Sequence, residues 1–145
     1  MRIVHISDTH NLHRKIKDLP FGDLIIHSGD VTMAGTDDEL MNFINWFKQL
    51  DYKYKIFIGG NHDYCLEEEN RETIQSLLPK NVFYLDKTAI RIENINIFGL
   101  PFFVSDAMSG DYEESIKLIP KDTSILITHR PPYGILDYSG TINYG

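Results

Sequence analysis

Four short clusters of polar residues carry the side chains with which this chain could do chemistry. They read Asp8-Thr9-His10, Gly29-Asp30, Gly59-Gly60-Asn61-His62-Asp63 and His129-Arg130-Pro131-Pro132. Taken singly, each has an ordinary explanation as a turn, because Asp, Asn and Gly are common turn residues. Together they offer carboxylate, amide and imidazole groups, which are ligands that divalent Mn, Fe, Zn or Ni ions accept at one site.

Each cluster directly follows an apolar stretch that is typical of a buried strand. These stretches end at Ile6, His27, Ile58 and Thr128. In open α/β sheets, ligands bind outside the carboxyl ends of the strands. We therefore expect the four clusters to meet at one edge of a sheet and to form a common metal site.

The elements that must position these clusters are predicted by runs of Ile, Val, Phe and Tyr. Such runs indicate strands at residues 2–6, 23–27, 53–58, 82–85, 89–92, 95–98 and 124–128, with a hairpin turn at Glu93-Asn94. Polar stretches that suit helices separate several of them, which favours an α/β fold. The 145 residues are enough for one compact domain, so residues 1–145 are treated as a single domain.

Three helices are predicted between the strands. Leu40, Phe43, Ile44 and Phe47 share one face of a helix, and Thr36 with Glu39 has the spacing of a capping box. Two shorter helices fit residues 71–78 and 112–119, each of which is followed by a proline that stops the helix. The first helix is expected to pack against the sheet, and Trp46 is assigned to that packing.

The predicted ligand set suits phosphoryl chemistry. Two cations about 3.5 to 4 Å apart can activate a water molecule and stabilise the attacking and leaving oxygens of a displacement at phosphorus. Asp30 could bridge two such ions. A phosphoryl-transfer or hydrolysis site is therefore the leading hypothesis.

The chain also resembles the calcineurin-like metallophosphoesterase superfamily, whose signature reads D-x-H, G-D, G-N-H-D/E, a later H, and G-H-x-H. The first four blocks stand here, in order, as Asp8-Thr9-His10, Gly29-Asp30, Gly60-Asn61-His62-Asp63 and His129. Residues 6–10, 26–30 and 128–137 are similar to a subgroup that includes metallophosphoesterase-domain proteins acting on cyclic nucleotides. The resemblance implies a layered β-sandwich core flanked by helices.

The resemblance also implies a role for each matching residue. Asp8 and His10 would hold the first of two divalent ions, Asp30 would bridge both, and Asn61 and His129 would hold the second. His62 would contact the phosphate and assist the leaving oxygen, while Asp63 would fix the tautomer and orientation of His62.

The function expected from these residues is metal-dependent hydrolysis of a phosphoester through a metal-activated hydroxide. A phosphodiester is the expected substrate class, with cyclic nucleotides among the candidates. Two alternatives stay open, namely a phosphomonoesterase and a core that binds a metal or a partner without turnover.

The final G-H-x-H block is absent, because no histidine follows His129. In the family these two histidines would each contribute one metal ligand, so we expect weak metal binding and slow or absent turnover in a monomer. A rebuilt site in a short protein, a fragment, and a protomer completed in trans are equally open explanations. In the third, a homodimer would supply ligands or shield an incomplete sheet edge.

Composition excludes several other functions. The chain has 14 basic and 21 acidic residues, and this acidic balance disfavours a nucleic-acid polymer as partner. Its apolar runs are far shorter than the roughly 20 residues of a membrane-spanning helix, and a secretory signal is not visible. A lone cysteine, Cys65, fits a reducing compartment, so a cytoplasmic location is expected.

Other histidines and one arginine have weaker claims to function. His5 and His27 lie in predicted strands and are expected to be packed and hydrogen-bonded. His13 is expected to lie on the surface. For Arg130, a contact with phosphate and an ordinary surface salt bridge are equally good interpretations.

Overall fold

Four parallel strands form the larger of two sheets in the computed structural model, which describes residues 1–110 and 112–143. The strands are β1 (Ile3–Ile6), β2 (Leu24–His27), β3 (Tyr54–Phe57) and β4 (Val82–Tyr84), paired in that order. The smaller sheet contains β5 (Thr88–Ile92), β6 (Ile95–Leu100) and β7 (Ile125–Thr128). All seven predicted strands are confirmed. So is the hairpin, in which β5 and β6 pair antiparallel around a turn where Glu93 has a φ of 53°.

The two sheets pack face to face through an aliphatic layer. Alternate residues of β2 and of the β3 segment turn toward the smaller sheet, as period-two side-chain geometry requires. The layer consists of Leu24, Ile26, Ile56, Ile58, Leu85, Ile92, Ile97 and Ile127. Removing these side chains from water stabilises the sandwich, so the layered α/β architecture is confirmed.

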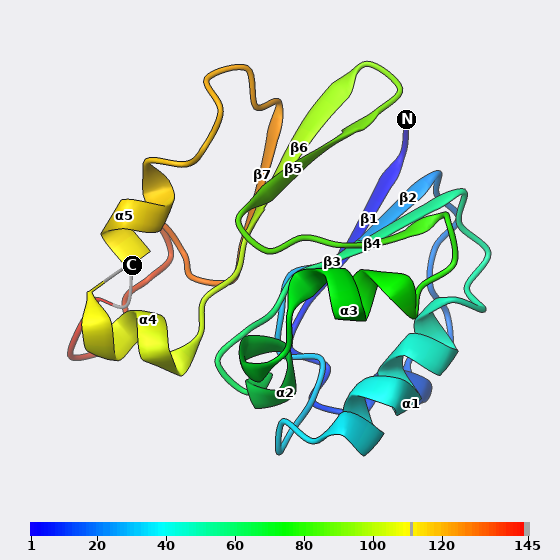
Figure 1. The fold of residues 1–145 in the computed structure, drawn as a ribbon, viewed down its shortest axis with the longest axis horizontal. Coiled ribbons are helices and arrows are strands. Elements are labelled where there is room, and N and C mark those ends of the chain that lie inside the picture. Colours follow the sequence, from blue (N-terminus) through cyan, green and yellow to red (C-terminus); the bar gives the residue numbers. More distant parts are fainter. Residues whose placement is uncertain (111, 144–145) are drawn as a thin grey trace.

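The opposite face of the larger sheet is covered by α1 (Asp37–Phe47), α2 (Tyr64–Glu68) and α3 (Arg71–Ser76), as Figure 1 shows. Aromatic rings dominate this second core. Phe43 stacks on Phe47 with ring centroids 5.0 Å apart, and Phe57 of β3 meets Phe43 edge to face at 5.4 Å. Trp46 belongs to the same core, which confirms its predicted role in packing.

Helix α1 begins as predicted, although only half of the capping box forms. The Thr36 hydroxyl accepts a hydrogen bond from the backbone N–H of Glu39 at 3.3 Å. The carboxylate of Glu39 turns instead to the backbone N–H groups of Met33 and Ala34. Glu39 thereby fixes the loop that follows β2, which carries part of the functional site.

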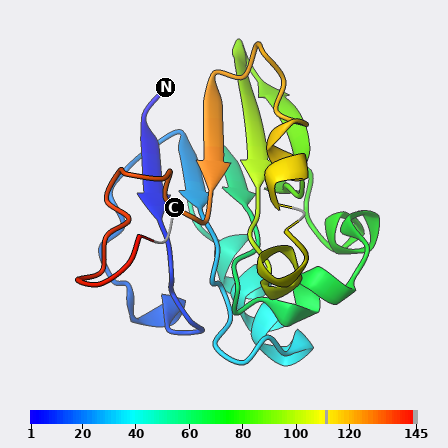
Figure 2. The ribbon, with the colours of Figure 1, turned by 90° about the vertical axis from the view of Figure 1, so that its left-hand side faces the viewer.

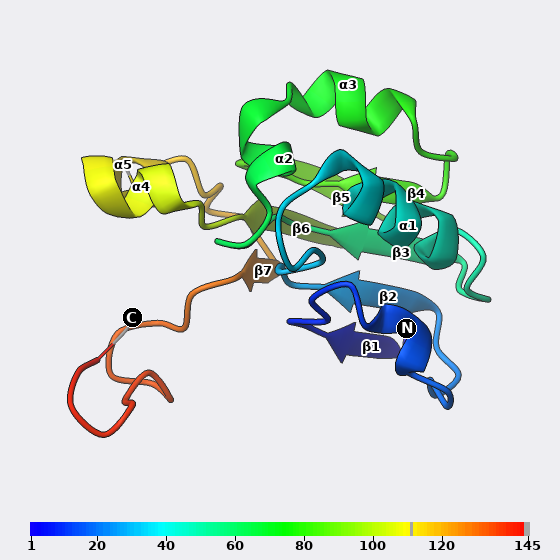
Figure 3. The ribbon, with the colours of Figure 1, turned by 90° about the horizontal axis from the view of Figure 1, so that it is seen from below.

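The remaining helices are short. Helix α3 and helix α5 (Tyr112–Ile116) end earlier than predicted, and α2, α4 (Val104–Ser109) and a 3-10 turn (His13–Lys15) were not predicted. Figure 3 shows α4 and α5 together at the end of the molecule away from α1. Every helix within the described ranges is too short or too polar to cross a bilayer.

His13 is buried rather than exposed, so its predicted surface position was wrong. Its ring lies against Trp46, with centroids 4.9 Å apart, and edge-on to Phe43. Burial, followed by the nearby charge of Arg14, lowers the pKa of His13 from 6.5 to about 4. The buried ring of His27 donates to or accepts from the Thr9 hydroxyl at 2.9 Å, and burial lowers its pKa to about 3.

Buried neutral histidines should make the fold sensitive to acid. The unfolded chain takes up a proton near pH 6.5 and the folded His13 only near pH 4, so the free energy of unfolding falls as pH drops through this window. The slope is about 1.4 kcal/mol per pH unit for each such group. His13→Phe should therefore make the loss of stability between pH 6.5 and 4 shallower, measured by urea unfolding at a series of pH values.

The matched control is Phe43→Leu, which alters the same ring contact without removing a titratable group. It should lower stability at every pH by a similar amount and leave the slope as in the parent chain. An unchanged slope in His13→Phe would contradict the assignment of acid sensitivity to this residue.

Candidate metal centre

The carboxyl ends of β1, β2, β3 and β7 lie at one edge of the sandwich. Strands β1 to β3 are mutually parallel, and Figure 2 shows β7 running in the same direction as β1 and β2. The loops after these strands bring two groups of potential ligands together: His10, Asp30 and His62, and Asp8, Asp30 and His129. Within each group the donor atoms lie within 4.8 Å of one another.

Backbone hydrogen bonds hold the first loop onto the second. The N–H of Asp8 donates to the carbonyl of Gly29, and the N–H of His10 donates to the carbonyl of Asp30, both at 3.0 Å. Asp8, His10 and Asp30 all have positive φ, at 53°, 43° and 57°. Non-glycine residues rarely adopt this left-handed region, and such strain persists where surrounding structure enforces it, commonly at functional sites.

Two glycines allow the loops to approach one another. A Cβ atom on Gly29 would lie 2.5 Å from Nδ1 of His129. A Cβ atom on Gly60 would lie 2.5 Å from the backbone nitrogen of Asp30 and 2.8 Å from Cε1 of His129. A side chain at either position would therefore push His129, which follows β7, away from Asp30.

The three histidines of the site are oriented in the same way. Nδ1 of His10, His62 and His129 lies 3.3, 2.9 and 2.9 Å from the backbone carbonyl oxygens of Thr32, Met33 and Ser28, respectively. A carbonyl can only accept, so each Nδ1 carries a proton and donates it. In the neutral ring Nε2 is then left with its lone pair, which is the form that binds a metal.

The Nε2 atoms and their neighbours form a cluster of acceptors that suits a cation. Nε2 of His129 lies 3.0 Å from Oδ1 of Asn61 and 3.4 Å from Oδ1 of Asp30, while Nε2 of His10 lies 3.6 Å from Oδ2 of Asp30. Lone pairs that face one another at these distances repel unless a proton or cation lies between them. The nitrogen, carboxylate and amide donors fit the borderline divalent ions.

The grouping of ligands differs in two respects from the one that the family resemblance implied. Asp8 lies in the group with Asp30 and His129 rather than in the one with His10. His62, which was expected to touch only the phosphate, lies close enough to His10 and Asp30 to share an ion. Asp30 belongs to both groups, which is the arrangement a bridging ligand needs.

Asp63 has a different role from the predicted one. Its carboxylate accepts hydrogen bonds from the backbone N–H groups of Val31, Thr32 and Gly60 and from the Thr32 hydroxyl, at 2.7 to 3.2 Å. Burial raises the pKa of Asp63, and these hydrogen bonds oppose the rise. The carbonyl of Met33, rather than Asp63, orients the ring of His62. Asp63 instead joins the loops that follow β2 and β3.

Sequence reasoning did not find the carbonyl groups of Ser28, Thr32 and Met33. Backbone carbonyls leave no signature in the residue types, because every residue has one. The hydroxyl of Thr32 also lies 2.7 Å from Oδ1 of Asp63 and 2.9 Å from the backbone carbonyl of His62, and its single proton is shared between these two acceptors. The one sequence signal that could have pointed to Thr32 is its position two residues after Asp30.

The fold and this centre define the class of protein. Residues 1–143 match the family model described as Calcineurin-like phosphoesterase. The chain belongs to this family, whose members are typically metal-dependent, and the resemblance stated from the sequence is confirmed.

Two curated proteins are similar to the chain in sequence. It is 33% identical to human metallophosphoesterase domain-containing protein 1 over 166 residues, covering 94% of this chain and 50% of the relative. It is 31% identical to the Caenorhabditis elegans UPF0046 protein K07C11.7, covering the whole chain and 56% of that protein. The chain thus spans about half the length of these curated relatives.

Among solved structures, a protein of unknown function from Aquifex aeolicus aligns with a TM-score of 0.41 and 17% sequence identity. The alignment covers 81% of this chain and 71% of the Aquifex chain.

Because Asp30 belongs to both ligand groups, Asp30→Asn should weaken binding at both. The amide oxygen of Asn can still accept the hydrogen bond that Asp30 receives from the N–H of His62, so the loop should keep its shape. We expect Mn²⁺ affinity to fall by more than the 10- to 100-fold typical of losing an outer partner of a ligand. Isothermal titration calorimetry and elemental analysis measure this.

Asp18→Asn is the control for this variant, because Asp18 is an exposed carboxylate outside both groups. It should bind Mn²⁺ like the parent chain. Unchanged affinity and stoichiometry in Asp30→Asn would remove Asp30 from the bridging role.

Proposed function

We propose that this chain is a metal-dependent phosphoesterase that hydrolyses phosphodiesters, with cyclic nucleotides among the candidate substrates. The observation that carries the proposal is the pair of ligand groups that share Asp30 at the edge of the sandwich. The preference for a diester follows the resemblance of residues 6–10, 26–30 and 128–137 to the cyclic-nucleotide subgroup. A phosphomonoesterase is the alternative that the assays below distinguish.

The residues fit a dinuclear centre for Mn, Fe, Zn or Ni. His10 and Asp30 would hold one ion, and Asp8, Asp30, Asn61 and His129 the other. Divalent ions there supply Lewis-acid stabilisation of phosphoryl oxygens and lower the pKa of a water molecule. The protein's own part is to keep Nε2 of each histidine directed at the centre through the carbonyls that bind Nδ1.

His62 is the residue we assign to the leaving group. Its Nδ1 is held by the Met33 carbonyl at 2.9 Å, and its backbone N–H donates to Asp30 at 2.9 Å. Both bonds fix the ring at the mouth of the site. In the protonated ring Nε2–H can pass its proton to the departing alkoxide, which is general acid catalysis.

Location and assembly remain proposals as well. A cytoplasmic location is supported by the single, buried Cys65. A homodimer is supported by the position of β1 and β7 at sheet edges within the described residues, since an unpaired edge can accept another strand. Sedimentation velocity of the purified chain gives its mass in solution.

Hydrolysis should require the metal and favour a diester. The chain stripped with EDTA should be inactive toward bis(p-nitrophenyl) phosphate and should regain turnover with Mn²⁺. We expect kcat/KM for this diester to exceed that for p-nitrophenyl phosphate at least tenfold. Asp30→Asn, purified identically, reports any contaminating activity. A chain that binds Mn²⁺ but hydrolyses neither ester would be a binding core without turnover.

Loss of the His62 side chain should affect turnover more than metal binding. General acid catalysis contributes about 10²- to 10⁴-fold, so kcat of His62→Ala should fall within that range for an alkyl leaving group, with Mn²⁺ content unchanged. His5→Gln, a change at an exposed histidine of β1, should keep the parent rate. If His62→Ala also loses an ion, His62 is a ligand and its assignment as the acid is wrong.

A further inference from the structure

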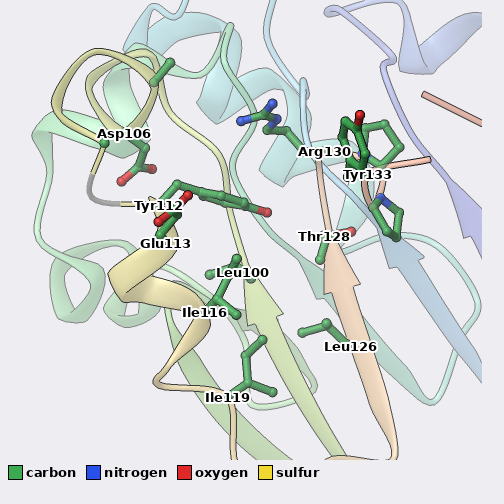
Figure 4. Close-up of a pocket in the computed structure, with 14 residues that line it drawn as sticks. Leu100, Asp106, Tyr112, Glu113, Ile116, Ile119, Leu126, Thr128, Arg130 and Tyr133 are labelled. Atoms are coloured by element: carbon green, nitrogen blue, oxygen red, sulfur yellow. The ribbon is translucent and has the colours of Figure 1, made fainter. Parts of the chain in front are cut away.

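A large cavity opens beside the metal centre, between helices α4 and α5 and the outer face of β6 and β7. Its volume is about 800 Å³, within the range of small-molecule pockets. Figure 4 shows Ile116, Ile119 and Leu100 on one side and Leu126 and Thr128 of β7 on the other. Several of these apolar side chains are open to solvent, including Leu126 at 44% and Ile116 at 47% exposure. A ligand that covers them would gain from the hydrophobic effect.

This cavity adjoins the metal centre. A second hollow of about 490 Å³ is lined by Asn61 and His129, two of the candidate ligands. The two hollows share Ala107, Arg130 and Pro131 as lining residues. A molecule with its phosphate at the metal centre could therefore extend past Arg130 into the larger cavity.

Arg130 is held at this junction by aromatic rings. Its guanidinium carbon lies 4.6 Å from the ring centroid of Phe102 and 5.6 Å from that of Tyr112. Phe102 and Tyr112 meet edge to face, with centroids 5.3 Å apart. Ring faces attract a guanidinium and limit its motion, and the planar N–H groups of an arginine match the geometry of phosphate oxygens. Arg130 thus lines both hollows, on the path that a substrate would take from the metal centre to the larger cavity.

We propose that the larger cavity binds the organic group of the phosphoester and selects an uncharged group of aryl size, while Arg130 contacts the phosphate. The inference rests on the proposed phosphoesterase function and adds the substrate class to it. Glu113 also lines the cavity, and its negative charge disfavours a second phosphate or carboxylate on the substrate. The aliphatic walls and the rings of Tyr112 and Tyr133 favour a flat apolar group.

A series of substrate analogues tests the cavity directly. The monomethyl esters of methyl-, phenyl- and 1-naphthylphosphonic acid carry the same single charge and differ only in the organic group. Calorimetry on the full Mn²⁺-loaded chain should give at least tenfold tighter binding for the naphthyl than for the methyl compound. This comparison uses the unaltered chain, so it does not depend on a variant that folds. Equal affinities would overturn the proposal.

Two variants locate the effect. Leu126→Asp should bring the naphthyl-to-methyl affinity ratio close to one, because a charged side chain replaces part of the apolar wall. Leu118→Asp is the control, because Leu118 is exposed but does not line the cavity, and it should keep the parent ratio. Arg130→Gln should weaken all three compounds by a similar factor of about ten or more. A ratio that survives Leu126→Asp would place the aryl group elsewhere and overturn the proposal.

The outcomes also separate this inference from the proposed function. Metal-dependent hydrolysis without any aryl preference would overturn the cavity assignment alone. An aryl preference abolished by Leu126→Asp, in a chain that hydrolyses no ester, would support the cavity and overturn the enzymatic function.

Discussion

Four hydrogen bonds to the buried carboxylate of Asp63 fix the spacing between the loops that follow β2 and β3. Three come from backbone N–H groups of Val31, Thr32 and Gly60, and the fourth comes from the Thr32 hydroxyl. One loop carries Asp30, and the other carries Asn61 and His62. Because a buried carboxylate without partners is costly, these donors and Asp63 depend on one another. The position of Asp30 relative to Asn61 and His62 follows from these hydrogen bonds.

The strands could be predicted because each is a short apolar run that must be buried in any compact fold. The edge at which their loops meet follows from the parallel order of β1, β2 and β3. Helices α2 and α4 were missed because neither has a clear apolar period. Asp63 is the N-cap residue of α2, but its side chain makes no capping hydrogen bond to that helix. Helix α4 is built from six mostly small or polar residues.

Within the site, residue types could be predicted but their partners could not. Asp8, Asp30 and His129 stand out in the sequence because their types suit a metal and they follow strands. The link from Asp63 to Thr32 spans 31 positions and has no local pattern. His13 looked like a surface residue beside Arg14 and Lys15, yet the η1 turn (His13–Lys15) directs its ring between Phe43 and Trp46. Tertiary packing decided both cases.

The imidazoles of the centre take their orientation from the main chain. His10, His62 and His129 each donate from Nδ1 to a backbone carbonyl oxygen. For His62 this carbonyl belongs to Met33, whose side chain is half exposed to solvent. Substitution of that methionine would change the surface around the mouth without changing the dipole that aligns the ring beneath it. The side chain at position 33 can thus change during evolution, and the surface around the site with it, while the histidine lone pairs keep their arrangement.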